Sequence, residues 1–281
     1  MKIIAALCLV TFVYCDSNSE KVTRNVHLTK KRISTRIING KDADIRDFPW
    51  QASLRTVEPL RHICGAAVVS ARVAVTAAHC FSHSKDPKSY SLEVGSSRLS
   101  GDTGTVVQVT KITKHPNFRK VYYTNRNDIA ILQFDQDIAG TSDKLATAVA
   151  IPTDDEDFSG SACNITGWGR VNAQDELSSD HLQRALTVVI TKDECKNISK
   201  YDWILDSEVC VYTGSDGACY GDSGGPLTCG NVLVGLTSFG KKNCVIQFPT
   251  VYTRISKFRD WIQKFIEKTS IHAPILSLSV F

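Results

Sequence analysis

Several signals of other protein classes are absent from this chain of 281 residues. The folded part has no surplus of basic side chains: residues 1–36 take 7 of the 33 basic and 2 of the 29 acidic residues, which leaves 26 against 27. A nucleic-acid-binding protein keeps positive charge on its folded part, so that class of partner is excluded. No C-x-x-C or H-E-x-x-H spacing occurs, so a zinc site is not predicted. No repeat of fixed period is present.

No hydrophobic run is long enough to cross a membrane. Ile3–Tyr14 is an apolar run of 12 residues behind Lys2, which is about 18 Å of helix against a bilayer core of about 30 Å. A short apolar core of this kind, with small polar residues after it, is typical of a secretory signal. Residues 1–15 are therefore predicted to be a signal peptide, and the protein to be secreted and extracellular, with no membrane partner.

The ten cysteines fit an oxidising compartment. Cys8 lies inside the predicted signal and Cys15 at its edge, so eight remain in the secreted part. Four disulfides are expected, and the sequence alone leaves 105 pairings open. The polar and basic segment 16–36 has few apolar anchors and is predicted to be a flexible arm.

From Ile37 onward the chain consists of short β-type runs separated by Gly, Asn, Asp and Pro. The clearest runs are Ala66–Val75, Thr105–Ile112, Ile129–Phe134, Leu186–Ile190 and Val232–Leu236. Several alternate apolar and polar residues, which is typical of half-buried antiparallel strands. Only the end shows clear helical spacing, in Phe258, Trp261, Ile262, Phe265 and Ile266, with Ser256 as the expected N-cap. The pattern predicts an all-β fold of two packed β-barrels or a sandwich, with a C-terminal helix.

Three short strings carry side chains that can act together in catalysis. They are Val75–Cys80 around His79, Asn127–Leu132 around Asp128, and Gly221–Pro226 around Ser223. A lone histidine, a lone aspartate or a glycine-rich turn is most often structural. The three together, in the order His, Asp, Ser, indicate nucleophilic catalysis by a serine.

The chemistry explains these residue types. A serine hydroxyl is a weak nucleophile at neutral pH and needs a base to take its proton. An imidazole such as that of His79 can accept that proton and return it to the leaving group, and the carboxylate of Asp128 can fix the imidazole tautomer. The glycines around Ser223 allow the backbone N–H groups of Gly221 and Ser223 to converge as an oxyanion hole.

With these strings the chain resembles the chymotrypsin-like (trypsin-fold) secreted serine proteases. Further strings that match the family are Arg36–Gly40, Cys163–Gly169 and Ser238–Gly240. The resemblance covers residues 37–269 and implies a protease domain of two packed six-stranded antiparallel β-barrels with the active site between them. It also implies one pairing of the eight cysteines: Cys64–Cys80, Cys163–Cys229, Cys195–Cys210 and Cys219–Cys244.

The resemblance further implies activation by cleavage. Residues 16–36 would be an activation propeptide that a trypsin-like protease removes after Arg36. The new ammonium group of Ile37 would then pair with Asp222 and order the oxyanion donors. Ser53 and His62 match the positions that hold this carboxylate in some zymogens, although His62 could equally be a surface histidine.

The specificity pocket that the resemblance implies is expected to differ from that of trypsin. The residues expected to line it are Gly217 at the base and Ser238, Phe239, Gly240 and Thr250 on the walls. Since Gly217 offers no carboxylate, cleavage is expected after apolar residues, with Leu, Phe, Tyr or Met first and Ala or Val also accepted. The alternative is cleavage after Arg or Lys, if a shift of one residue places Asp216 at the base.

No cofactor or metal is expected. Ser96 stands where calcium-binding relatives carry a carboxylate, so a calcium site is not predicted. Asn197 and Asn164 begin sequons for N-glycosylation. Residues 270–281 form an apolar tail without an assigned role.

The sequence therefore predicts a secreted serine endopeptidase, monomeric and digestive or secretory in role. Its expected partners are protein or peptide substrates, the activating protease and protein inhibitors. The rival from another class is an inactive homologue that acts as a binding protein, but such proteins usually lose a member of the triad, and this chain keeps all three.

Overall fold

The computed structural model describes residues 37–38, 40–100, 104–122, 124–139, 146–172 and 174–271. All of them belong to the unit Thr35–Phe281. The predicted signal peptide, the arm 16–36 with Arg36, and residues 272–281 of the tail lie outside the described part. Within the described ranges no helix is long and apolar enough to cross a membrane.

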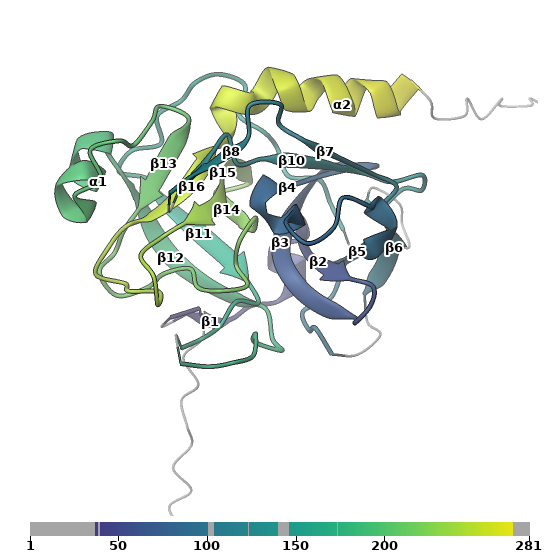
Figure 1. Cartoon of the computed structure of the whole chain (residues 1–281), viewed down its shortest axis with the longest axis horizontal. Coiled ribbons are helices and arrows are strands. Elements are labelled where there is room, and N and C mark those ends of the chain that lie inside the picture. The colour runs from purple at the N-terminus through teal and green to yellow at the C-terminus, as the bar shows by residue number, and fades with distance from the viewer. Residues whose placement is uncertain are drawn as a thin grey trace, which may run out of the picture. The chain divides into compact units, whose positions relative to one another are not determined.

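One sheet is a half-barrel with the strand order β6-β5-β2-β3-β4-β10-β7 (Figure 1). Its strands are β2 (Gln51–Thr56), β3 (Arg61–Ser70), β4 (Val73–Thr76), β5 (Tyr90–Val94), β6 (Thr105–Gln108), β7 (Lys111–Lys114) and β10 (Ala130–Gln133). All of its ladders are antiparallel, and the expected run Ala66–Val75 is divided between β3 and β4 by a hairpin.

The half-barrel has seven strands where six were expected, because one chain segment changes partner. Only Val109 and Thr110 separate β6 from β7. Val109 N–H donates to the carbonyl of Tyr90, which begins β5, and Thr110 N–H donates to that of Gln133, which ends β10. The segment 105–114 therefore pairs with one edge of the sheet through β6 and with the other through β7.

The second sheet closes into a barrel. Its strands are β1 (Lys41–Asp42), β11 (Ala162–Gly167), β12 (Gln183–Ile190), β13 (Glu208–Val211), β14 (Pro226–Cys229), β15 (Val232–Phe239) and β16 (Thr250–Arg254). The order is β1-β12-β11-β14-β15-β16-β13, and an additional pairing of β12 with β13 joins six strands in a ring with β1 outside it. The all-β fold with a C-terminal helix is thus confirmed, with one closed six-stranded barrel and one half-barrel.

The remaining elements are a hairpin and helices. They are β8 (Arg119–Val121) and β9 (Thr124–Arg126), α1 (Lys192–Ser199), α2 (Arg259–Ile271), and 3-10 turns at Ile45–Asp47, Ala78–Phe81, Pro87–Ser89 and Ile255–Phe258. Ser256 does not cap α2, which follows directly on the 3-10 turn that contains it. The Ser256 hydroxyl instead donates to Asp155 at 2.7 Å.

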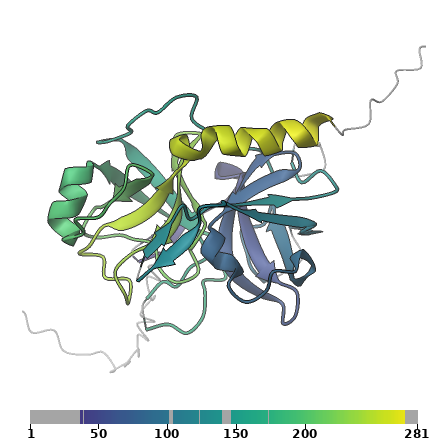
Figure 2. The same cartoon turned by 45° about the horizontal axis from the view of Figure 1, so that its top comes forward.

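Alternation along the strands builds the cores. In β12, Gln183, Ala185, Thr187 and Val189 are buried while the residues between them are exposed. One apolar cluster joins both sheets to α2, and its members include Trp50, Ile131, Leu236 and Ile262. Figures 1 and 2 show α2 lying along both sheets, so this cluster and the helix fix the half-barrel against the closed barrel.

The described residues form four disulfides. Cys64–Cys80 lies in the half-barrel, and Cys163–Cys229, Cys195–Cys210 and Cys219–Cys244 lie in the closed barrel and its loops. This is the pairing that the resemblance implies. Every one of them closes a loop within its own half of the described chain.

Candidate active site

His79 is placed by the 3-10 turn Ala78–Phe81 directly after β4. Its backbone N–H donates to Asp128 Oδ1 at 2.9 Å, and its ring Nδ1 lies 2.7 Å from Asp128 Oδ2. A carboxylate can only accept, so Nδ1 carries the hydrogen and Nε2 keeps its lone pair. No described residue bonds to Nε2, which leaves that nitrogen available as a base.

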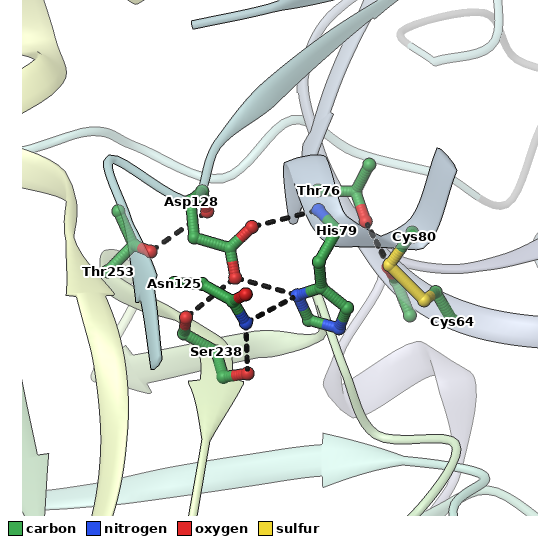
Figure 3. A network of polar contacts seen from close by, with 9 residues as sticks. Cys64, Thr76, His79, Cys80, Asn125, Asp128, Ser238 and Thr253 are labelled. Carbon is green, nitrogen blue, oxygen red and sulfur yellow. Dashed lines mark hydrogen bonds and ion pairs between the residues drawn. A yellow bond between two sulfur atoms is a disulfide. The ribbon is translucent and has the colours of Figure 1, made fainter. Parts of the chain in front are cut away.

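Asp128 is held from both halves of the protein (Figure 3). It precedes β10 of the half-barrel, and its side chain has no exposed surface. Ser238 of β15 donates its hydroxyl to Asp128 Oδ2 at 2.6 Å, and Thr253 of β16 donates to the Asp128 carbonyl at 2.9 Å. Three hydrogen bonds to the carboxylate fix its direction toward His79.

Asn125 is a further neighbour of this pair that the sequence did not reveal. Its side-chain amide lies 3.4 Å from His79 Nδ1 and donates to the Ser238 carbonyl at 3.5 Å. Figure 3 shows it alongside the imidazole. No motif distinguishes this asparagine from a surface residue of the β8–β9 hairpin, so only the fold brings it to the site.

Ser223 lies in the turn that leads into β14. Its carbonyl accepts from Gly65 N–H at 2.8 Å, which attaches the turn to β3 of the half-barrel. Ser223, Gly221 and His79 line the same open cleft, which has a volume of about 920 Å³. The three predicted strings therefore meet: His79 and Asp128 are hydrogen-bonded, and Ser223 faces the cleft that His79 also lines.

The backbone around Ser223 is a compact series of turns. Asp222 N–H donates to the Cys219 carbonyl at 3.0 Å, and Gly225 N–H donates to the Asp222 carbonyl at 2.9 Å. Gly221 has φ of 102°, in the left-handed region that side chains disfavour. The amides of Gly221 and Ser223 donate to no group in the described part of the chain, so both can serve a ligand oxygen in the cleft.

Asp222 is buried on the other side of this turn. Its carboxylate accepts from Gly169 N–H at 2.8 Å and from Cys219 N–H at 2.9 Å. Gly167 and Gly169 leave room for it, because a Cβ on either would lie within 2.3 Å of its oxygens. Burial raises the pKa of Asp222 to about 6, and the two amide bonds oppose that rise. No cation pairs with this carboxylate among the described residues.

Ile37 is almost fully buried, with 1% of its surface exposed. It packs in the same apolar cluster as Tyr252, and the charge of Asp222 contributes, after burial, to raising the pKa of Tyr252. Ile38 forms an antiparallel bridge with Gly217. Ile37 therefore lies in the core of the closed barrel, and Ile38 lies beside Gly217 of the proposed pocket.

Ser53 and His62 lie together behind the turn with Gly221. Ser53 Oγ is 2.8 Å from His62 Nδ1, and His62 Nε2 donates to the Gly221 carbonyl at 3.0 Å. The pair that the sequence assigned to holding Asp222 thus contacts the residue before it. Of the two interpretations of His62, a fully exposed surface histidine does not fit, because the residue is half-buried and its ring packs against Trp168 at 5.9 Å between ring centres.

Gly217, Gly240 and Thr250 lie close together. A Cβ added to Gly217 would be 3.9 Å from Thr250 Oγ1, and one added to Gly240 would be 3.8 Å from both Cγ2 and Oγ1 of Thr250. The same added Cβ on Gly217 would lie 3.5 Å from Ile246 Cγ2. Ile246 is a further apolar neighbour that sequence reasoning missed, since it lies in the loop before β16 and carries no motif.

Ser238 and Phe239 end β15 directly before Gly240. The hydroxyl of Ser238 is turned toward Asp128, as described above. Phe239 packs against Trp203 with ring centres 5.7 Å apart, and Trp203 stacks on Tyr201 at 4.7 Å. An aromatic group thus supports the strand that leads to Gly240.

Asp216 is held within a tight turn. Its Oδ2 accepts from Ser215 Oγ at 2.9 Å, and its backbone N–H donates to Thr213 Oγ1 at 3.0 Å. Its neighbour Gly217, in contrast, is buried against Ile246 and Thr250. This arrangement places Gly217 next to Thr250.

The remaining predicted sites lie apart from the cleft. Asn197 is exposed on α1, whereas Asn164 is half-buried in the middle of β11. Ser96 is buried and hydrogen-bonded to the backbone of Arg98. The sulfur atoms of Cys64 and Cys80 approach His79, but both are in a disulfide and are not free to bind a metal ion.

Comparison with known proteins agrees with this geometry. The family model described as Trypsin matches residues 37–262. A chymotrypsin-like serine proteinase of Haliotis rufescens is 34% identical over 243 residues, which cover 82% of this chain and 92% of that protein. Fibrinolytic enzyme isozyme C of Lumbricus rubellus is 34% identical over 80% of this chain and 98% of its own length. Transmembrane protease serine 9 of Rattus norvegicus is 33% identical, but the match spans 22% of its length.

Proposed function

Because the chain belongs to the trypsin family of serine endopeptidases, we propose that Ser223, His79 and Asp128 carry out its peptide hydrolysis. The observation that carries the proposal is the hydrogen bond of 2.7 Å between His79 Nδ1 and the fully buried carboxylate of Asp128. It leaves Nε2 as a base in the cleft that Ser223 lines.

The steps follow from these positions. His79 Nε2 takes the hydroxyl proton as Ser223 Oγ attacks the scissile carbonyl, and Asp128 stabilises the resulting imidazolium. The amides of Gly221 and Ser223 donate to the developing oxyanion. His79 then returns the proton to the leaving amine, and the acyl-enzyme forms. A water molecule, deprotonated by His79, hydrolyses the acyl-enzyme and restores the serine.

A fluorescently labelled organophosphonate that reacts with activated serines tests this assignment. Such a reagent reacts with a serine only where a base activates it, so the activated protein should be labelled in a single position, Ser223. The Ser223→Ala variant should keep the native circular dichroism spectrum and lose both labelling and peptide hydrolysis. An unlabelled wild-type protein would instead favour the rival function, an inactive homologue that binds proteins.

We propose apolar specificity for the pocket formed by Gly217, Gly240 and Thr250. Burying the cation of an Arg or Lys substrate without a counter-charge costs several kcal/mol, and Gly217 supplies none. The hydrogen bond from Ser215 to Asp216 supports placing that carboxylate away from the pocket. Chromogenic peptides ending in Leu or Arg decide between the two, with Asp216→Asn as the control. A preference for Arg that disappears in Asp216→Asn would establish the trypsin-like alternative.

We also propose that the protein is made as a secreted zymogen, in which residues 1–15 are the signal and 16–36 the propeptide. The buried position of Ile37, and the carboxylate of Asp222 that pairs with no cation among the described residues, support activation by a cut after Arg36. The propeptide has no cysteine and no recognisable interaction module, which favours a digestive or other independent secreted enzyme. Exposure favours Asn197 over Asn164 as the glycosylated residue. The monomeric state and the protein inhibitors stay predictions.

A further inference from the structure

A buried polar chain connects β5 with the turn that carries Gly221. Glu93 of β5 forms an ion pair with Arg55 of β2. Arg55 Nε donates to Ser53 Oγ at 3.3 Å, and this hydroxyl lies 2.8 Å from His62 Nδ1. His62 Nε2 lies 3.0 Å from the Gly221 carbonyl. The half-barrel therefore reaches the backbone of the proposed oxyanion hole through four side chains.

The charged end of this chain is enclosed. Glu93 is 3% exposed and Arg55 is 6% exposed. Arg55 also donates from Nη2 to the Leu99 carbonyl at 3.0 Å. The carboxylate of Glu93 lies against Gly104, where a Cβ would be 2.8 Å from its Oε1. Such a pair is stable only while both charges remain, because removing one leaves the other buried and unpaired.

The directions of the hydrogen bonds follow from what each group can donate. The Gly221 carbonyl can only accept, so His62 Nε2 carries a hydrogen. The guanidinium of Arg55 can only donate, so Ser53 Oγ accepts from it and directs its own hydrogen to His62 Nδ1. His62 is therefore neutral, with its hydrogen on the nitrogen that faces Gly221.

Protonation of His62 would break this order. A second hydrogen on Nδ1 would meet the hydroxyl hydrogen of Ser53 and would add a cation beside Arg55. Burial lowers the pKa of His62 to about 4; the bond to Gly221 opposes this change, and the charge of Arg55 adds to it. Arginine stays charged in proteins, so its effect persists over the working pH range.

Other charged groups could attract a protonated His62. Asp222 follows Gly221 in the same turn, and Glu176 and Asp180 line the cleft from the loop after β11, as His62 does. A neutral imidazole prefers a carbonyl acceptor, whereas an imidazolium gains more from a carboxylate. The charge state of His62 thus decides whether its ring donates to the Gly221 carbonyl or to a neighbouring carboxylate.

We propose that Arg55 and Glu93 are positioning residues for the oxyanion hole: they keep His62 a neutral donor to the Gly221 carbonyl and so hold the Gly221–Asp222 peptide unit, which lies between the Gly221 and Ser223 amides. This inference rests on the proposed serine protease function. Neither residue touches the substrate, and their effect reaches the reaction through Ser53, His62 and the Gly221 peptide.

Kinetics of charge variants in the activated enzyme test the proposal. Loss of one oxyanion donor costs about 10²–10³ in kcat, so partial misplacement of the Gly221 amide in Arg55→Met should cost roughly tenfold with KM little changed. The loss should grow as the pH falls from 8, because without the Arg55 charge His62 gains a proton at a higher pH than in the wild-type enzyme. Arg55→Lys keeps the cation and should keep the wild-type pH profile. Asp137→Asn, which removes a partly exposed ion pair with Arg72 in the same half-barrel, is the matched control.

Active-site titration separates positioning from stability. All rates are expressed per titrated site, so a variant that only folds poorly loses sites and keeps its kcat. A wild-type kcat per site in both Arg55→Met and Glu93→Gln, with an unchanged pH profile, would overturn the proposal. If Arg55→Met does not fold, the kcat per titrated site and the pH profile of Glu93→Gln alone test the proposal.

A second measurement does not depend on activity. In a Ser223→Ala background, NMR of the histidine ring nitrogens should show His62 neutral, with the hydrogen on Nε2, down to a pH of about 4. In Arg55→Met the titration of His62 should move to higher pH. An unmoved titration, or a hydrogen on Nδ1, contradicts the proposal even if the wild-type protein has no protease activity, which the absence of phosphonate labelling would show separately.

Discussion

Thr250 limits the depth of the proposed specificity pocket, and replacing it by alanine should open the pocket to aromatic side chains. The Cβ site of Gly240 is 3.8 Å from Thr250 Cγ2, and one bond of about 1.5 Å separates that site from the Cα of Gly240. At most about 5 Å therefore lies between the backbone of Gly240 and the Thr250 side chain. An aromatic ring in contact with both walls needs about 7 Å, since each contact takes 3.5–4.0 Å.

The size of the effect follows from the part of the ring that Thr250 excludes. Burying an additional part of an apolar side chain in a pocket is worth about 1–3 kcal/mol in discrimination. This spacing changes the order expected from the sequence, which placed Phe and Tyr beside Leu and Met. We now expect the wild-type enzyme to cleave after Leu, Met or Ala in preference to Phe or Tyr. Removing Oγ1 and Cγ2 should raise the ratio of kcat/KM for Phe over that for Leu by roughly tenfold, since tenfold corresponds to about 1.4 kcal/mol.

The assay compares chromogenic peptides that differ only in the residue before the scissile bond: Ala, Leu, Phe and Arg. Thr228→Ala is the matched control, because Thr228 is buried in β14 of the same barrel and its hydroxyl has no partner in the described structure. A wild-type preference for Phe over Leu, or an unchanged ratio in Thr250→Ala, would refute the argument that Thr250 narrows the pocket.

Three further predictions follow from hydrogen bonds and burial. Ser238→Ala removes the donor 2.6 Å from Asp128 Oδ2. Because a hydrogen bond to a charged group is worth about 1.5–3 kcal/mol, steady-state kinetics should show kcat lowered roughly ten- to hundredfold. An unchanged kcat would contradict the role of Ser238. In the uncut chain the pKa of Asp222 is raised from 3.8 to about 6, so the native state holds a proton that the unfolded chain has lost. That stabilisation is present below pH 3.8 and is lost as the pH rises through about 6. Urea unfolding should therefore show that the free energy of unfolding falls by up to about 3 kcal/mol between pH 4 and 7, and this fall should be missing in Asp222→Asn. Cleavage after Arg36 should convert an inert chain to an active one whose N-terminal sequence is Ile-Ile-Asn-Gly; full activity of a form cut at Lys30, Lys31 or Arg32 would contradict the pairing of Ile37 with Asp222.

The fold class was predictable because alternation in the strands and spacing in the last helix are local patterns. Individual elements were harder to predict. The helix α1 has a capping box, in which Thr191 Oγ1 accepts from Glu194 N–H and the Glu194 carboxylate accepts from Thr191 N–H. This Thr-x-x-Glu signal was available in the sequence. The N-cap prediction for Ser256 was wrong because tertiary contact with Asp155 competes for its hydroxyl.

The candidate site was predictable where residues carry a motif and not where the fold brings unmarked residues together. The strings around His79, Asp128 and Ser223 stand out in the sequence. In contrast, Asn125 and Ile246 belong to loops without a distinctive pattern, and Arg55 and Glu93 are 38 positions apart on two strands. Such pairs depend on strand register, which a single sequence does not determine.

The confinement of each disulfide to one half of the described chain has a mechanical consequence. The half-barrel carries His79 and Asp128, and the closed barrel carries Ser223 and Ser238, yet no disulfide between described residues joins the two halves. Their alignment depends on hydrogen bonds and on the apolar cluster under α2. Hydrostatic pressure favours hydration of such contacts. The two halves should therefore slip and inactivate the enzyme reversibly at pressures at which each half, held by its own disulfides, keeps its strands.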